Sequence, residues 1–180
     1  VITEGIVNQA VTNDYLIKYI VTKNEQSDVA YQLVSVSGQL LQLGLNINNY
    51  DESATPNNHG WSSSMSNDGN YLVVSSPGYD NDRGMINIYT FNPVTIHWDI
   101  MTSLTGPNAG GNFGYSVALS GDGSRVAVGA PNHGNGLVRV YEYSDSTWTQ
   151  IGSDLSGSAG GKFGWSVSLN NTGSYVTVGE

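Results

Sequence analysis

Residues 113–143 read FGYSVALSGDGSRVAVGAPNHGNGLVRVYEY, and this stretch decides the fold. Small or apolar residues alternate with polar ones up to the turn Gly121-Asp122-Gly123, and the alternation resumes over 125–128. This pattern predicts a β-hairpin with a tight, glycine-rich turn. A third strand is expected over 137–143 and a fourth over 148–155. One unit is therefore predicted to be a four-stranded antiparallel meander.

The same pattern recurs along the chain at a spacing of about 50 residues. Asp122 follows Asp68, which lies in the turn Asn67-Asp68-Gly69, by 54 residues (122 − 68), and Phe163 follows Phe113 by 50 (163 − 113). A single four-stranded sheet leaves both apolar faces wet, and only neighbouring sheets cover them. We therefore predict an all-β fold, a β-propeller made of four-stranded antiparallel blades of about 50 residues.

The predicted blades divide the chain into four parts. They are a degenerate first blade at 1–57, a second blade at 58–111, a third at 112–161 and the first half of a fourth at 162–180. The strands expected in the first blade lie at 6–12, 15–22, 31–36 and 39–45, with a polar loop at 23–28. About three and a half blades do not close the usual ring of about four to eight. The sequence is therefore expected to be a fragment of a larger ring.

Residue size along the predicted innermost strands fits a propeller. Strands near the axis are crowded, which favours small residues such as Gly114, Ser116, Ala118, Gly164, Ser166 and Ser168. Bulky rings are expected to fill the spaces between blades, namely Tyr115, Trp165, Trp98 and Trp148. His59 is expected to pack where the phenylalanines of the later repeats pack.

Charge and composition exclude several classes of function. The chain has 6 Lys plus Arg against 15 Asp plus Glu, for a net charge of −9, and its cations do not cluster. Binding to a phosphate backbone needs clustered cations, so no nucleic-acid partner is expected. Cysteine is absent, which excludes disulfides, thiolate metal sites and a cysteine nucleophile. No apolar run approaches the roughly 18 residues of a membrane helix, so no membrane insertion is expected.

One repeated motif resembles a known family. Phe113-Gly114 followed by Gly129-Ala130-Pro131 is similar to an FG-GAP repeat, the blade type of integrin alpha-subunit propellers and of many bacterial, algal and viral surface proteins. Phe163-Gly164 repeats the first half, and His59-Gly60 with Ser75-Ser76-Pro77 is a weakened copy. The resemblance covers residues 59–180 and implies a fold more than an activity.

The family resemblance also suggests calcium, which the residues do not support. FG-GAP repeats often bind calcium in the turn between the first two strands, with a pattern Asp-x-Asp-x-Asp-Gly. The corresponding turns at 66–70, 120–124 and 170–174 hold one carboxylate or none, whereas calcium takes about six to eight oxygens. Asp68 and Asp122 are therefore expected to act as turn formers beside glycine.

A weaker cation candidate is the loop between the second and third strands of the second unit. Asp80, Asn81 and Asp82 place two carboxylates and an amide close together, which suggests at most a weak calcium site. The alternative is a solvated loop in which Arg83 compensates Asp80 or Asp82. No further ligands converge on the loop in the sequence, so the second interpretation is favoured, and no resident cofactor is predicted.

Catalytic motifs are not found in the sequence. His59, His97 and His133 lie in different units, without the short spacing of a zinc site. No Gly-x-Ser-x-Gly turn and no glycine-rich phosphate loop with its lysine occurs. We therefore expect a protein that is not an enzyme. Asn170-Asn171-Thr172 matches the acceptor pattern for N-glycosylation at Asn170, in a predicted exposed turn.

Three loops are expected to line one face of the propeller, at 106–111, 132–136 and 156–161. They are small and polar, which suits a protein partner or a glycan, although tight connections between blades need the same residues. The leading hypothesis is a non-enzymatic adhesion or scaffold module on a cell, an extracellular filament or a virion, and thus extracellular. The alternatives are a carbohydrate-binding module that stacks sugars on rings such as Tyr79, and the non-catalytic part of a larger secreted hydrolase or lyase.

Overall fold

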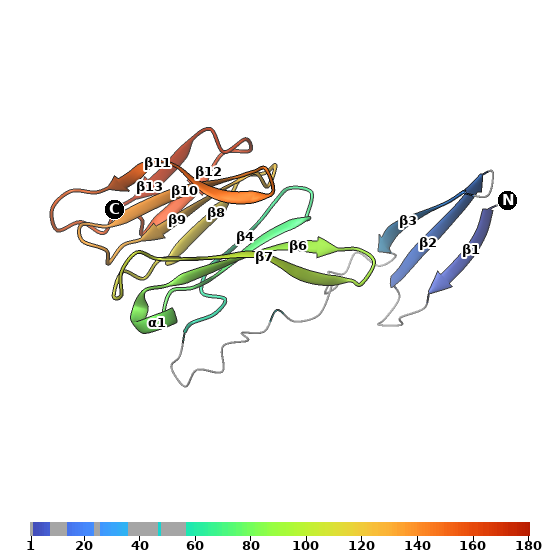
Figure 1. Cartoon of the computed structure of the whole chain (residues 1–180), viewed down its shortest axis with the longest axis horizontal. Coiled ribbons are helices and arrows are strands. Elements are labelled where there is room, and N and C mark those ends of the chain that lie inside the picture. The colour runs from blue at the N-terminus through green and yellow to red at the C-terminus, as the bar shows by residue number, and fades with distance from the viewer. Residues whose placement is uncertain (1, 8–13, 24–25, 36–46, 48–56) are drawn as a thin grey trace. The chain divides into compact units, whose positions relative to one another are not determined.

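The structure is a computed structural model that describes residues 2–7, 14–23, 26–35, 47 and 57–180 (Figure 1). The chain divides into two compact units, residues 1–45 with 93–96 and residues 46–92 with 97–180. Both units are built from antiparallel β-strands, as the sequence predicts. Within the described ranges, no helix has the length and apolar character needed to cross a membrane.

The first unit contains a three-stranded antiparallel sheet in the order β1-β2-β3. Its strands are β1 (Ile2–Val7), β2 (Asp14–Lys23) and β3 (Gln26–Ser35). The strands β2 and β3 pair along their whole length, from Asp14 opposite Ser35 to Lys23 opposite Gln26. This sheet is a hairpin with one further strand beside it.

The predicted first blade agrees with this sheet only in part. The strand expected at 15–22 is confirmed as β2, whereas β1 begins at Ile2, earlier than expected. The polar loop expected at 23–28 is wrong, because β2 continues to Lys23 and β3 begins at Gln26. Strand pairing is made by backbone groups, so polar side chains do not end it. The strand expected at 39–45 lies outside the described residues.

The second unit begins with a four-stranded antiparallel sheet in the order β4-β5-β6-β7. Its strands are β4 (Ser63–Met65), β5 (Tyr71–Ser76), β6 (Met85–Asn92) and β7 (His97–Thr105). Each strand pairs with the next one in the sequence, so the sheet is the meander that the pattern predicts.

The stretch 113–143 lies in a second four-stranded sheet, in the order β8-β9-β10-β11. Its strands are β8 (Ser116–Leu119), β9 (Arg125–Ala130), β10 (Leu137–Ser144) and β11 (Thr147–Ser156), and a two-stranded sheet follows, with β12 (Ser166–Leu169) and β13 (Val176–Gly179). Val117 pairs with Val128 and Leu119 with Val126 across the predicted glycine-rich turn. The hairpin and the third and fourth strands are confirmed.

The hydrophobic core of the second unit joins its two four-stranded sheets. Val73, Ile86 and Ile88 from the first of these sheets belong to the same buried cluster as Val126 and Val128 from the second. The short first strands lie next to one another, since β8 contacts both β4 and β12 (Figure 1). Each sheet thus covers an apolar face of its neighbour, which is the reason for repetition inferred from the sequence.

Small side chains let these first strands approach closely. The Leu119 N–H donates to Ser64 Oγ at 2.9 Å, and the Ser116 hydroxyl donates to the Gly164 carbonyl at 2.8 Å. A Cβ atom added to Gly129 would lie 2.1 Å from that same carbonyl oxygen. The prediction of crowding by small residues is confirmed at these positions.

The two phenylalanines of the repeated motif lie in equivalent junctions. Phe113 forms an isolated parallel β-bridge with Gly84 of the preceding sheet, and Phe163 forms the same bridge with Gly136. Gly84 has φ of 81° and Gly136 has φ of 94°, where L side chains are strained. A Cβ on either glycine would lie 2.0 to 2.3 Å from backbone atoms of its phenylalanine. Only glycine fits at this junction.

The segment labelled α1 (Tyr79–Asp82) is a single turn between β5 and β6. Residues 80–82 have φ between 47° and 59°, a left-handed conformation that Asp and Asn tolerate better than most side chains. The Asp82 carbonyl accepts a hydrogen bond from the Asn112 N–H at 2.7 Å. The loop predicted at this position is therefore a left-handed turn that holds the beginning of the next sheet.

Candidate functional site

A turn with the same hydrogen bonds precedes β4, β8 and β12. The N–H of the motif glycine donates to a carbonyl at the end of the second strand, with N···O distances of 2.8 to 3.0 Å for Gly60, Gly114 and Gly164. An aromatic residue follows each of these glycines, and its N–H closes the turn at 2.9 to 3.1 Å. The three aromatic residues are Trp61, Tyr115 and Trp165.

These three rings form a continuous row across the three sheets, which we call the aromatic row. The Trp61 and Tyr115 centroids are 5.3 Å apart, and the Tyr115 and Trp165 centroids are 4.7 Å apart, with interplanar angles of 50° and 46°. Trp61 remains 54% exposed and Trp165 52% exposed. Exposed aromatic rings of this size are typical of binding surfaces.

The expectation that large rings fill the spaces between sheets is only partly correct. Trp148 is buried and packs on Tyr143 with centroids 5.3 Å apart, as part of the core. Trp98 packs on Phe91, which lies opposite it within the same sheet. Trp165 packs on Tyr115 of the neighbouring sheet, as expected for a ring between sheets, but it remains half-exposed at the end of the aromatic row.

A chain of polar contacts lies at the same end of the sheets as the aromatic row. The Asn112 side-chain amide donates to the Pro77 carbonyl, and Asn132 donates to Asn112 Oδ1 at 2.6 Å. Lys162 in turn donates to Asn132 Oδ1. The structure thus joins loops from three repeats through polar side chains, of which Asn132 and Lys162 are exposed and Asn112 is half-buried. It brings the predicted loop at 132–136 next to the ends of the two connecting loops.

The opposite ends of the first strands carry the Asp-Gly turns. Asp122 accepts hydrogen bonds from the Ser120 hydroxyl at 2.6 Å, the Ser124 N–H at 3.0 Å and the Ser124 hydroxyl at 2.7 Å. The Ser120 hydroxyl and the Ser124 N–H hold the pKa of Asp122 below its ordinary value. Asp68 makes equivalent bonds with Ser66 and Asn70, which lower its pKa in the same way. Both aspartates build turns.

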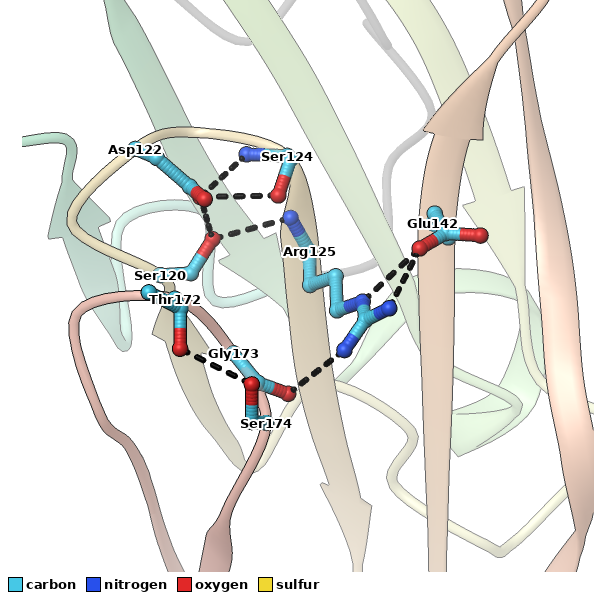
Figure 2. A network of polar contacts seen from close by, with 8 residues as sticks. All are labelled: Ser120, Asp122, Ser124, Arg125, Glu142, Thr172, Gly173 and Ser174. Atoms are coloured by element: carbon cyan, nitrogen blue, oxygen red, sulfur yellow. Dashed lines mark hydrogen bonds and ion pairs between the residues drawn. The ribbon is translucent and has the colours of Figure 1, made fainter.

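Figure 2 shows how the turn that contains Asp122 is bonded to the neighbouring strand and to the next turn. Arg125 donates from Nε and Nη2 to Glu142 Oε1 at 2.9 and 2.6 Å, and from Nη1 to the Gly173 carbonyl at 3.2 Å. Its backbone N–H donates to Ser120 Oγ at 2.9 Å. One guanidinium therefore connects the third strand of its own sheet with the turn of the next sheet. These hydrogen bonds link neighbouring sheets, so we assign the network a structural role.

The lowered pKa of Asp122 leads to a prediction on pH dependence. A carboxylate whose pKa falls on folding stabilises the protein fully above the unfolded pKa of about 4, and that stability is lost as pH falls through the folded pKa. We expect the unfolding free energy of Asp122→Asn to fall less than that of the wild type on acidification below about pH 4. Urea unfolding followed by tryptophan fluorescence measures this difference.

Asp145 supplies the control for this measurement. It lies in the exposed turn between β10 and β11 and accepts one hydrogen bond, from the Ser144 hydroxyl at 3.2 Å. Asp145→Asn is expected to retain the acid dependence of the wild type. Parallel acid dependence of Asp122→Asn and the wild type would contradict a stabilising role for the Asp122 carboxylate.

The predicted weak cation loop is engaged in other contacts. Asp80 forms an ion pair with Arg83 at 2.9 Å, as the alternative interpretation expected, and both side chains are partly exposed. The Asn81 carbonyl accepts from the Gly110 N–H at 3.0 Å, and Asp82 is exposed. In the part of the chain that the structure describes, no group of three or more His, Cys, Asp or Glu residues is placed to hold a metal ion. Calcium binding at this loop stays a prediction.

The three histidines have different surroundings. His59 Nδ1 lies 2.9 Å from Ser76 Oγ, and burial lowers the pKa of the ring. Phe113 is fully buried, whereas His59, which replaces the phenylalanine in the motif, is half-buried and makes a polar contact. Equivalent packing of His59 stays a prediction. His97 is exposed at the start of β7, and the N–H of His133 closes the turn after β9.

Asn170 occupies the turn position of Ser66 and Ser120. Its Oδ1 accepts from the Tyr175 N–H at 2.9 Å, and its Nδ2 donates to Thr172 Oγ1 at 3.2 Å. The side chain is exposed, as the prediction of an exposed turn requires. Glycosylation at Asn170 stays a prediction.

A small cleft lies between β7 and the β10–β11 hairpin. Its volume is about 300 Å³, and its lining residues are Met101, Thr102, Tyr143, Ser146, Thr147 and Trp148. None of these side chains is charged, so the lining offers neither a carboxylate nor an imidazole for acid–base chemistry or metal binding.

Sequence reasoning missed the glycines that receive the phenylalanines. Gly84 and Gly136 precede the third strands, and Gly106 and Gly157 follow the fourth strands. A Cβ on either of the latter pair would lie 2.6 or 2.4 Å from the phenylalanine Cβ. The sequence did contain a signal for them. Gly84 and Gly136 are 52 residues apart (136 − 84) and Gly106 and Gly157 are 51 apart (157 − 106), close to the spacing of the Phe-Gly pairs.

Comparisons with known proteins give distant structural likenesses only. No family model matches the chain, and no curated protein matches it. Among solved structures, a candidate 6-phosphogluconolactonase from Bacteroides uniformis ATCC 8492 is 15% identical, with 96% of this chain and 48% of that chain covered and a TM-score of 0.49. TolB from Acinetobacter baumannii is 17% identical, with 88% of this chain and 30% of that chain covered and a TM-score of 0.38.

A third structure is similar to the same degree. It is a candidate 6-phosphogluconolactonase from Bacteroides fragilis NCTC 9343, 10% identical, with 98% of this chain and 41% of that chain covered and a TM-score of 0.44. The chain therefore spans less than half the length of each of these proteins. At these identities and TM-scores the likenesses assign neither a family nor an activity.

Proposed function

We propose that the second unit is part of a β-propeller of the FG-GAP type, with blades of about 50 residues, and that it acts as a non-enzymatic structural and interaction module. The observation that carries this proposal is the repeated junction. Gly84 with Phe113 and Gly136 with Phe163 form the same parallel bridge. Adjacent first strands and outward-running meanders are the arrangement that a propeller requires.

The use of charged side chains supports a structural role. Arg125 binds Glu142 and the next turn, and Arg139 forms an ion pair with Asp154 at 2.8 Å. The aspartates of the turns accept hydrogen bonds from their own loops. These groups are committed to contacts within and between sheets, whereas catalysis requires groups free to exchange protons with a substrate.

The end of the sheets that carries the aromatic row is the proposed interaction face. Two half-exposed tryptophans lie at the same end of the sheets as the half-buried Asn112, the exposed Asn132 and the connecting loops. Large rings supply contact area at low entropy cost, and small polar loops let a partner approach the backbone. We propose a protein or glycan partner and, from the FG-GAP resemblance, a location outside the cell or on a virion.

The second candidate function is carbohydrate binding at the same face. The half-exposed rings of Trp61 and Trp165 favour it, because an exposed indole offers a flat apolar surface to a sugar. Tyr79, the ring considered from the sequence, is half-buried and therefore less suited to stacking.

A double substitution of the aromatic row tests the proposed face. We expect the full chain carrying Trp61→Ala and Trp165→Ala to lose at least about tenfold in affinity for its partner, because aromatic residues dominate binding energy at interfaces. Binding is measured on a glycan array and on purified surface proteins of the native source. Ile100→Ala is the control, since Ile100 is 52% exposed but lies on β7.

The outcomes of this experiment separate the two candidates. Binding to array glycans that is lost in the double variant supports carbohydrate recognition, and protein binding lost in the same way supports the adhesion or scaffold role. Equal binding by the double variant and by Ile100→Ala would contradict the proposed face.

A further inference from the structure

The Asn135-Gly136 peptide occupies a chemically sensitive place in the loop between β9 and β10. It is the single Asn-Gly sequence in the chain. Asn135 is exposed, whereas Gly136 is buried and forms the bridge to Phe163. A reactive dipeptide therefore lies at a junction between two sheets.

Asparagine followed by glycine can lose its side-chain amide without an enzyme. The glycine backbone nitrogen attacks the asparagine Cγ and a new N–Cγ bond forms, while this nitrogen gives up its proton to water. The Cγ–Nδ2 bond then breaks, and the side-chain nitrogen takes up a proton from water and leaves as ammonia. Water then opens the five-membered succinimide at either carbonyl, which yields aspartate or isoaspartate. The balanced change is asparagine plus water to an acid plus ammonia, and it involves no oxidant or cofactor.

The folded structure holds this peptide unit from both sides. The Gly136 N–H donates to the His133 carbonyl at 2.8 Å, and the Asn135 carbonyl accepts from the Phe163 N–H at 3.4 Å. Gly136 lies so close to Phe163 that an added Cβ would be 2.3 Å from the Phe163 nitrogen. The nucleophilic nitrogen is thus buried and hydrogen-bonded, and the peptide plane is fixed.

We propose that Asn135 is a site of spontaneous deamidation whose rate is controlled by the junction between Gly136 and Phe163. The Gly136 nitrogen becomes available to Cγ of Asn135 only when this junction opens. The rate of deamidation therefore depends on how often the junction opens. Isoaspartate adds one carbon to the backbone between residues 135 and 136. The bridge that needs Gly136 in its present position then no longer forms, and deamidation loosens the junction irreversibly.

The preceding junction lacks this chemistry and provides an internal comparison. There the residue before the bridging glycine is Arg83, whose carbonyl accepts from the Phe113 N–H at 3.2 Å. Arginine has no side-chain amide to cyclise, so the same geometry carries no such reaction. The two junctions therefore differ in chemical durability although they are alike in shape. The modified loop also belongs to the proposed interaction face, where a new carboxylate adds a negative charge.

Peptide mapping by mass spectrometry tests this proposal on the full chain. Aspartate and isoaspartate at position 135 are measured over time in the native protein, in Phe163→Ala and in the chain unfolded by urea. We expect the native rate to be at least about tenfold below the unfolded rate, since only the open fraction reacts, and the Phe163→Ala rate to lie between them. Asn108, exposed and followed by Ala109, is the control and should not differ between native protein and variant.

A second measurement applies if Phe163→Ala fails to fold. Deamidation at Asn135 and hydrogen exchange of the Gly136 amide are followed in wild-type protein at increasing urea concentrations below the unfolding transition. The two rates should rise together, because both need the same opening. A native rate equal to the unfolded rate, or exchange that rises while deamidation stays constant, would overturn the proposal.

Discussion

Gly136→Ala is expected to lower the free energy of unfolding of the second unit by at least about 3 kcal/mol. The new methyl carbon would lie 2.3 Å from both the nitrogen and the oxygen of Phe163, and backbone atoms cannot move aside as a flexible side chain does. A residue with φ of 94° is also strained when it carries a Cβ. All four tryptophans lie in the second unit, so urea unfolding followed by tryptophan fluorescence measures the loss there.

Gly134→Ala is the matched control in the same loop. Gly134 also has positive φ, 58°, but a Cβ there would have no neighbour within 4 Å. Gly134→Ala should lower the free energy of unfolding by only about 1–2 kcal/mol, which is the strain of a left-handed residue alone. If the two variants are destabilised equally, the close approach of Gly136 to Phe163 does not hold the sheets together.

Phe113→Ala is expected to cost about 3–5 kcal/mol of unfolding free energy. The side chain is fully buried, and its ring packs edge-on against Tyr141 with centroids 6.3 Å apart. Truncation removes the apolar contact and leaves a cavity in the core shared by two sheets. Urea unfolding with the same fluorescence signal measures the change.

The control for this substitution is Phe163→Ala at the equivalent position of the next repeat. Phe163 is half-buried, so its truncation should cost less, about 1–2 kcal/mol. A cost at Phe113 no larger than the cost at Phe163 would contradict the inference that the Phe113 ring anchors the core between the two four-stranded sheets.

The hairpins were predictable from the sequence because their signals are local. Alternation on both sides of Gly121-Asp122-Gly123 determines which residues face inward, and Val117 and Val128 are paired as that alternation requires. The spacing of Phe113 and Phe163 likewise predicts equivalent surroundings, and the two bridges confirm it. Repetition thus indicated that the two positions are equivalent, but not which glycines the phenylalanines contact.

The candidate site was less predictable because it depends on contacts between repeats. Nothing near Trp165 in the sequence indicates that it lies beside Tyr115 and remains half-exposed. For residues 80–82 the sequence favoured a solvated loop with an Arg83 ion pair, which the structure contains, but it did not indicate that backbone carbonyls of a left-handed turn bind the start of the next sheet. The chemistry of side chains can be inferred from a sequence, whereas main-chain contacts between neighbouring sheets cannot.

The junctions between sheets have a consequence for how such a chain can change over evolutionary time. The hydrogen bonds at each bridge join main-chain groups, from the Phe113 N–H to the Arg83 carbonyl and from the Phe163 N–H to the Asn135 carbonyl. Because every amino acid except proline brings the same backbone N–H and carbonyl, a duplicated unit inherits compatible connections at both of its borders. Copies can then diverge widely in their side chains, as Arg83 and Asn135 do, while remaining able to assemble.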